Sequence, residues 1–487
     1  MRVTPSAILQ NLNVKAVLAI MKKYLNKFPS VPIELIIALT CCLFMLVSYS
    51  SLAGVSQKEV QKLGEVLTPF GSILGGNIDR SIPAWTGGIS KPEAKSGEHH
   101  TDLFKDEEPI LVIDSDNLEK YSKNLTAGQL KMFNSFSDSY SMNIYPSYRT
   151  HAMPDWVNKN SIENAKSSSL SKKGTGVINA YGGIAFPILH GSNSDQALQT
   201  MWNHMTRWRG IYVVRRTSEI AVNRNGQFNT VINQQEVLFN FHVPGKAFDD
   251  LDNKLLYYIT FTVSPARLAG GALLVHETLD QTIQKREAWD YNAGQRRVRR
   301  APNLAYDSPL ASSNHIAAID EVDMYNGAPD RYSWNYKGLS ERYIPYNNYK
   351  INEKGRQYSD MLKPGHIDPE FVRWEKHRVH VVEATLKKQS RHVYAKRTFY
   401  IDEDSWSIAM SEQYDRRGEM LHFNMSLLKN FYELPGVFTS ADVIHDLQSQ
   451  KYFVHGLYSE ETNAPVFHSE PPPKRYFTSS SLRRRGR

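Results

Sequence analysis

The feature that most constrains the fold is a series of short segments, beginning after Gly210, in which apolar and polar residues alternate with period two. This alternation predicts half-buried strands. Turn residues rather than helices connect the segments, and Asn223-Arg224-Asn225-Gly226 is a hairpin turn in which the glycine supplies the positive φ. The sequence therefore predicts a meandering antiparallel sheet and not a parallel βαβ sheet. We expect its strands at 211–222, 228–238, 255–262, 272–277, 288–298, 371–385, 392–401, 406–414 and 420–428.

Loop-rich segments precede and interrupt these strands. Residues 54–190 hold turn residues around single aromatic side chains, and only short helices are expected there, at 55–63 and 127–136. A longer helix is expected at 194–209, because its apolar residues recur at helical spacing. A second loop-rich stretch, at 301–368, is interpreted as an insertion between two groups of strands.

The first 53 residues have the pattern of an export signal. Cations around Met21 precede an apolar run of 13 residues at 35–47, which is shorter than a membrane span requires. Small residues at Ser51 and Ala53 occupy the −3 and −1 positions of a signal-peptidase site. We therefore expect residues 1–53 to be a signal peptide, with cleavage between Ala53 and Gly54.

Two alternatives to this interpretation stay open. The residues before Met21 lack the signal pattern, so translation starting at Met21 is one alternative. Glu34 weakens the apolar run, so an uncleaved anchor is the other. Cleavage would remove Cys41 and Cys42, the two cysteines of the chain. A mature chain without thiols suits the oxidising periplasm.

Charge is concentrated at the two ends of the chain. The formal net charge is +8, of which residues 1–53 contribute +4 and residues 474–487 contribute +6, so residues 54–473 carry −2. A net charge this close to zero over residues 54–473 is not that of a nucleic-acid-binding domain. We expect residues 459–487 to form a basic, disordered tail, either solvated or in contact with anionic lipid.

Known sequence signatures of catalysis are absent. The chain has no Walker loop, no G-x-S-x-G, no H-E-x-x-H and no G-x-G-x-x-G motif. We interpret its densest carboxylate cluster, Asp402-Glu403-Asp404-Ser405, as a hairpin tip rather than a cation site or an acid–base pair. His377 and His380 share one predicted strand and point to opposite faces, so they make a poor metal pair. We expect no catalytic residue, no cofactor and no metal.

The densest group of cations in the body of the chain lies in the predicted strand 288–298 and just after it. It consists of Arg296, Arg297, Arg299 and Arg300. Alternation puts Arg297 and Arg299 on one face and the other two on the opposite face. Such guanidinium groups bind phosphates or carboxylates bidentately. Pairing with acids of the body, such as Glu321 and Asp323, or plain solvation is the open alternative.

Six motifs occur in order along the chain: 67–69, 82–88, 181–187, 295–302, 324–332 and 379–396. Together they resemble a bacterial family known as domain of unknown function 1329, and the resemblance runs from about residue 56 to 458. Members of that family are described as outer-membrane lipoprotein-sorting proteins with the fold of LolA and LolB. The resemblance implies a mainly β fold with some α: a curved antiparallel sheet, an incomplete barrel closed on its concave side by helices and long loops. Residues 191–458 would form this half-barrel, and residues 54–190 would pack on it.

The same resemblance implies a periplasmic carrier or chaperone that binds a lipid or lipidated substrate in an apolar cavity, for transport to or across the outer membrane. Shielding a sixteen-carbon chain from water is worth about 12 kcal/mol, at roughly 0.8 kcal/mol per methylene. The four arginines are then candidates for a head-group rim. Candidate cavity aromatics are Trp289, Tyr291, Tyr325 and Tyr346.

Partners and alternatives follow from the resemblance as well. It implies an outer-membrane barrel protein and an inner-membrane transporter of the resistance–nodulation–division type as partners, and a place in the periplasm or at the periphery of the outer membrane. One alternative function is a structural adaptor of a trans-envelope assembly with a filled interior. A second is an envelope hydrolase that uses carboxylates such as Asp402, Asp404 or Glu383.

Overall fold

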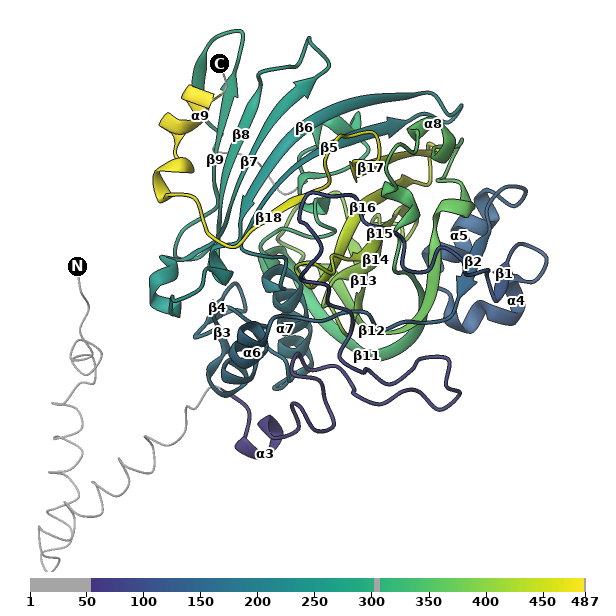
Figure 1. Ribbon diagram of the computed structural model, residues 1–487, viewed down its shortest axis with the longest axis horizontal. Helices are drawn as coiled ribbons and strands as arrows, with labels where there is room; N and C mark the ends of the chain where they lie inside the picture. The colour runs from purple at the N-terminus through teal and green to yellow at the C-terminus, as the bar shows by residue number, and fades with distance from the viewer. Residues whose placement is uncertain (1–53, 302–306, 486–487) are drawn as a thin grey trace, which may run out of the picture. The chain divides into compact units, whose positions relative to one another are not determined.

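One curved sheet of sixteen strands organises the part of the chain that the structure, a computed structural model, describes: residues 54–301 and 307–485 (Figure 1). The predicted signal peptide, with Ala53, lies outside the described residues. In chain order the strands are β1 (Leu111–Ile113), β2 (Met142–Tyr145), β5 (Tyr212–Val222), β6 (Phe228–Leu238), β7 (Lys254–Ser264), β8 (Ala272–Thr278), β9 (Glu287–Asn292), β10 (Arg297–Arg300), β11 (Tyr332–Pro345), β12 (Arg373–Leu386), β13 (Lys396–Asp402), β14 (Ile408–Tyr414), β15 (Met420–Asn430), β16 (Val437–Asp446), β17 (Lys451–Leu457) and β18 (Val466–His468).

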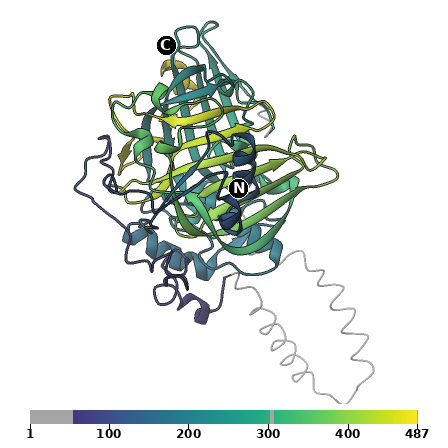
Figure 2. The same ribbon diagram turned by 90° about the vertical axis from the view of Figure 1, so that its right-hand side faces the viewer.

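The sheet is mixed and does not close. From β12 the hydrogen-bonded order runs β13, β14, β15, β16, β17, β5, β6, β7, β8, β9 and β10. Neighbouring strands are antiparallel, except that β2 pairs with β12 in parallel. Strand β11 covers the other edge of β12, and among the described strands β10 pairs only with β9. Figure 2 shows the teal strands β5–β9 and the green strands β11–β14 in different parts of the curl.

Helices pack on both faces of this sheet. Thr126 and Ser192 cap α5 and α7, each in a capping box with the residue three positions on. Helix α7 packs on β11 and β12, while α5 packs on β14 and β15. No helix within the described ranges has both the length and the apolarity needed to cross a bilayer. The helices are α3 (Gln57–Val60), α4 (Leu118–Tyr121), α5 (Ala127–Ser135), α6 (Asp155–Ser167), α7 (Asn193–Thr206), α8 (Tyr358–Met361) and α9 (Ser479–Arg485).

Two large hydrophobic clusters form the core. The first holds α7 side chains such as Met201 together with Ile259 and Leu274 of β7 and β8. The second holds α5 side chains such as Phe133 together with Val379 of β12. Strands with apolar residues on both faces, such as β13, take part in both clusters, so much of the sheet is buried on both sides.

Several strands differ from the sequence expectation. The segment 288–298 is not one strand: β9 and β10 form a hairpin whose turn holds Arg296 in the left-handed region, at a φ of 51°. The insertion 301–368 contains β11, whose pairing with β12 shifts between Tyr336 and Gly338. That shift interrupts the alternation, which hides the strand from periodicity. Strands β16 and β17 and helix α6 were not predicted.

The C-terminal residues also differ from the expectation of a disordered tail. Val466–His468 pairs with β5 as β18, Lys474–Tyr476 forms a turn of 3₁₀-helix, and Ser479–Arg485 forms α9. Phe477 and Leu482 are buried, at 2% and 0% exposure. Two apolar side chains in a basic stretch are enough to anchor it on the sheet, and they are easily overlooked among the charges.

Candidate functional site

The last four strands of the path, β7–β10, present an apolar inner face to the first core cluster. Directly paired residues of antiparallel strands share a face, so Ile259, Leu274 and Trp289 lie in one row. Ile259 and Leu274 are fully buried, while Trp289 is partly exposed. We call this surface the inner face: Tyr257, Ile259, Phe261, Ala272, Leu274, His276, Glu287, Trp289, Tyr291, Val298 and Arg300.

The C-terminal segment, residues 474–485, covers the inner face. The ring of Phe477 stacks on Tyr257, with centroids 5.5 Å apart. His276 Nε2 lies 2.9 Å from the carbonyl oxygen of Phe477, and Leu482 joins the first core cluster. In Figure 1 the yellow helix α9 lies beside β8 and β9. The C-terminal segment thus packs on the inner face together with other side chains of the first core cluster, and the sheet does not close over it.

A buried carboxylate interrupts this apolar surface. Glu236 of β6 pairs with Ile259, so it continues the inner face, and it is 2% exposed. Its Oε2 accepts a hydrogen bond of 2.8 Å from the hydroxyl of Tyr212, and its Oε1 accepts one from Arg485 of the C-terminal segment. Burial and the neighbouring carboxylate raise the pKa of Tyr212, which keeps this hydroxyl a donor.

The predicted arginine rim divides between the two faces. All four arginines are exposed. Arg300 pairs with Trp289 and lies on the inner face, where its Nη2 donates to Glu287 at 2.7 Å. Arg297 and Arg299 pair with Asn292 and Asp290 and lie on the opposite face, and Arg296 lies in the hairpin turn.

The acids that were proposed as alternative partners of these arginines are used elsewhere. Glu321 contacts His422 at 3.2 Å, and Asp323 pairs with Arg207 and Arg209. The arginines of β10 therefore do not pair with Glu321 or Asp323 in the part of the chain that the structure describes.

The predicted cavity aromatics do not gather in one place. Trp289 and Tyr291 lie on the inner face. Tyr325 packs edge-on against Phe399, 5.5 Å away, deep in the first core cluster. Tyr346 belongs to the second cluster and lies against His377, with ring centroids 4.1 Å apart. Only the first two of these four side chains can meet a ligand on the inner face.

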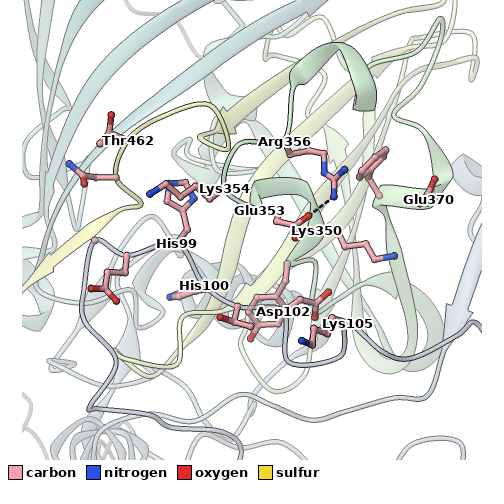
Figure 3. Close-up of a pocket in the computed structure, with 16 residues that line it drawn as sticks. His99, His100, Asp102, Lys105, Lys350, Glu353, Lys354, Arg356, Glu370 and Thr462 are labelled. Atoms are coloured by element: carbon pink, nitrogen blue, oxygen red, sulfur yellow. Dashed lines mark hydrogen bonds and ion pairs between the residues drawn. The ribbon is translucent and has the colours of Figure 1, made fainter.

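A pocket of about 750 Å³ opens elsewhere, between residues 97–105, the loop after β11 and residues 462–463 (Figure 3). Charged side chains of both signs line it, among them Asp102, Lys350 and Glu370. Its lining suits a polar ligand and not an acyl chain. Sequence reasoning missed it because its residues come from separate segments that share no motif.

The carboxylate-rich turn between β13 and β14 is a hairpin tip, but it is buried. Asp402, Glu403 and Asp404 are at most 2% exposed. Arg149 donates to both oxygens of Asp404, at 2.7 and 2.9 Å, and Arg378 donates to Glu403 at 2.6 Å. Paired in this way, the carboxylates tie the sheet to its covering loops. Glu383, the third hydrolase candidate, pairs with lysines of β11 and β13.

His377 lies next to this turn, and its nitrogens with oxygens of Asp402 and Asp404 form a group within 4.8 Å. Its Nε2 is 3.3 Å from Glu375, and its Nδ1 is 3.6 Å from Asp402. Burial lowers the pKa of His377, but the neighbouring carboxylates of Asp402 and Glu375 outweigh burial and raise it to about 9. A protonated imidazole has no lone pair for a metal. That this group holds no transition metal stays a prediction.

The chain is similar to known proteins over most of its length. The sequence profile of the family described as protein of unknown function (DUF1329) matches residues 112–483. The protein PA3922 of Pseudomonas aeruginosa is 38% identical over 443 residues, which cover 91% of this chain and 96% of that protein.

Two solved structures are similar at lower identity. One is described as an outer membrane lipoprotein-sorting protein domain from Vibrio parahaemolyticus, with 16% identity, a TM-score of 0.41 and coverage of 60% of this chain and 100% of that one. The other is the LolA superfamily protein NE2245 from Nitrosomonas europaea, with 14% identity, a TM-score of 0.35 and coverage of 59% and 98%.

Proposed function

Because this chain belongs to the DUF1329 family and its open sheet has an apolar inner face, we propose that it is a carrier for a lipid or lipidated substrate in the bacterial cell envelope. The observation that carries the proposal is that the C-terminal segment covers the inner face of β7–β10, and that the sheet does not close over it.

The chemistry of the inner face suits acyl chains. It joins aromatic rings such as Phe261 and Trp289 to the aliphatic side chains of Ile259 and Leu274. Each methylene that moves from water onto such a surface contributes roughly 0.8 kcal/mol. Displacing the C-terminal segment would open this surface while the hydrogen-bonded strands beneath it stay paired.

The envelope location and the partners belong to the same proposal. The export signal expected in residues 1–53 supports the periplasm, with delivery to or across the outer membrane. An outer-membrane barrel protein and a resistance–nodulation–division transporter are the partners we propose. Binding without catalysis fits the structure, because Asp404 is fully buried in an ion pair with Arg149 and Asp402 is fully buried beside His377.

Native mass spectrometry of the protein purified from its own cell envelope tests the proposal. We expect a co-purified lipid on the wild type and at least a fivefold lower occupancy on Trp289→Ser, which places a hydroxyl on the inner face. Leu273→Ser is the matched control, because Leu273 pairs with Asp290 and Thr260 and lies on the opposite face.

Other outcomes would count against a carrier. A lipid-free protein in a stable complex with envelope proteins would favour the structural adaptor. Turnover of an envelope lipid or glycan that is lost in Asp404→Asn would favour the hydrolase.

A further inference from the structure

We propose that the inner face receives an amphiphile with a cationic head group, and that Arg485 occupies the head-group position in the present structure. This inference rests on the proposed function and names the class of ligand. It comes from the contacts of one buried carboxylate, Glu236, with the C-terminal segment.

Glu236 requires a positive partner. Its side chain lies in a mostly apolar part of the inner face, next to Ile259 across the strand pair, and it is 2% exposed. A carboxylate in such surroundings is costly unless a cation and hydrogen bonds compensate it. Tyr212 supplies one hydrogen bond, and Arg485 supplies the charge. Whatever displaces Arg485 must therefore bring a positive charge of its own.

Aromatic rings complete the position. The guanidinium carbon of Arg485 lies 4.6 Å from the ring centroid of Phe261, on the inner face, and 4.1 Å from that of Tyr476, in the C-terminal segment itself. Ring faces attract cations, and ammonium groups are recognised by such combinations of carboxylate and aromatic side chains. Arg485 Nη1 is buried without a hydrogen-bond partner among the described residues, so this position satisfies only part of the guanidinium.

The C-terminal segment presents its groups in the arrangement that an amphiphile would have. Phe477 and Leu482 supply apolar surface to the inner face, and Arg485 follows Leu482 by one turn of α9. An anionic head group at the same position would meet Glu236 without a counter-ion. The inner-face arginine, Arg300, already pairs with Glu287.

The ligand class is accordingly an alkyl or acyl chain with a single ammonium group. Dodecylammonium and dodecanoate are suitable probes, because they share a chain length and differ in the sign of the head group. The full chain is used, with Arg485→Ala to vacate the cation position. Isothermal titration below the micellar concentration measures both affinities, and the shift of the melting temperature gives a second measurement.

We expect Arg485→Ala to bind dodecylammonium about tenfold more tightly than dodecanoate and more tightly than the wild type does. The double variant Arg485→Ala with Glu236→Gln removes both charges, so no buried charge is left unpaired, and it should bind the two probes equally. Arg484→Ala is the matched control, because Arg484 is the exposed neighbour of Arg485, and it should bind as the wild type.

The possible failures separate the two proposals. Equal binding of both probes by Arg485→Ala, or a preference for dodecanoate, would overturn the cationic head group and leave the lipid carrier standing. Binding of neither probe by Arg485→Ala, with the melting temperature unchanged by either, would overturn both.

Discussion

At the scale of single residues, two histidines of β12 show how strongly surroundings decide charge. His377 lies between Glu375 and Asp402, whose carboxylates outweigh the effect of burial and raise its pKa to about 9. His380, on the opposite face, stacks on Trp406 with centroids 4.6 Å apart, and burial lowers its pKa to about 3. One strand therefore holds a charged and a neutral imidazole three residues apart.

This difference predicts a pH dependence of stability. A pKa raised from about 6.5 to about 9 means that His377 stabilises the fold fully below pH 6.5, and that this contribution is lost as the pH rises through 9. At about 1.4 kcal/mol per pKa unit, the loss is about 3 kcal/mol. Chemical denaturation of wild type and His377→Gln between pH 6 and 10 should show the wild type losing this much more stability.

His380→Gln is the control for that measurement above pH 8, where this histidine is neutral in both the folded and the unfolded chain and adds no slope. There its curve should run parallel to that of the wild type. Groups other than His377 that titrate between pH 6 and 10 contribute to all three curves and cancel in the comparison. If the curve of His377→Gln also ran parallel to that of the wild type, the imidazole would not be charged in the folded protein.

At the scale of elements, helix α5 packs closely on β15 through a residue that looks unfavourable in the sequence. Gly128 lies in the first turn of α5, where glycine costs roughly 1 kcal/mol relative to alanine. A Cβ atom at this position would lie 2.1 Å from the ring of Phe423. The glycine permits this close approach, and its N–H donates to Glu412 at 2.8 Å.

Gly128→Ala is therefore expected to lower the free energy of unfolding by about 1–3 kcal/mol, the usual cost of overpacking. Helix propensity alone predicts the opposite sign. Thermal unfolding measures the change, with Asn134→Ala on the exposed side of α5 as the control that keeps or slightly raises the melting temperature. A stabilised Gly128→Ala protein would mean that helix and strand lie further apart.

At the scale of the whole molecule, the open sheet leaves one long apolar surface that the end of the chain covers. The covering segment and its nearest contacts are far apart in sequence: Arg485 and Glu236 are separated by 249 positions. No neighbouring residues of the chain hold these two partners together, so the C-terminal segment is held on the sheet by the burial of Phe477 and Leu482. The C-terminal segment is thus the element over the inner face that a ligand displaces most readily.

The N-terminal processing of the chain is also a prediction at this scale. If Ser51 and Ala53 form a signal-peptidase site, the mature protein begins at Gly54 and fractionates with the periplasm. Edman sequencing of the protein from fractionated cells measures this directly. An intact N-terminus at Met1 or Met21 would contradict the export signal.

By itself, the sequence determined the class of the fold and the family. Alternation in segments such as 211–222 and 228–238 is a local property, and it placed β5 and β6 to within one residue. Where a bulge interrupts alternation, as in β11, or where strand and turn are both short, as at Arg296, the local pattern failed.

Only the tertiary structure decided the candidate site. Alternation in the sequence separates Arg297 from Arg300 but does not say which of them lies on the covered face. Pairing across four strands put Arg300 and Trp289 on the face that the C-terminal segment covers. It also brought the basic end of the chain, which the sequence alone presented as a solvated tail, onto Glu236. The physical reason is that the register of each strand is fixed relative to the strand beside it, so the position of a residue depends on every pairing between it and the next residue of interest. The neighbours of a buried charge are therefore set by the whole sheet and not by residues nearby in sequence.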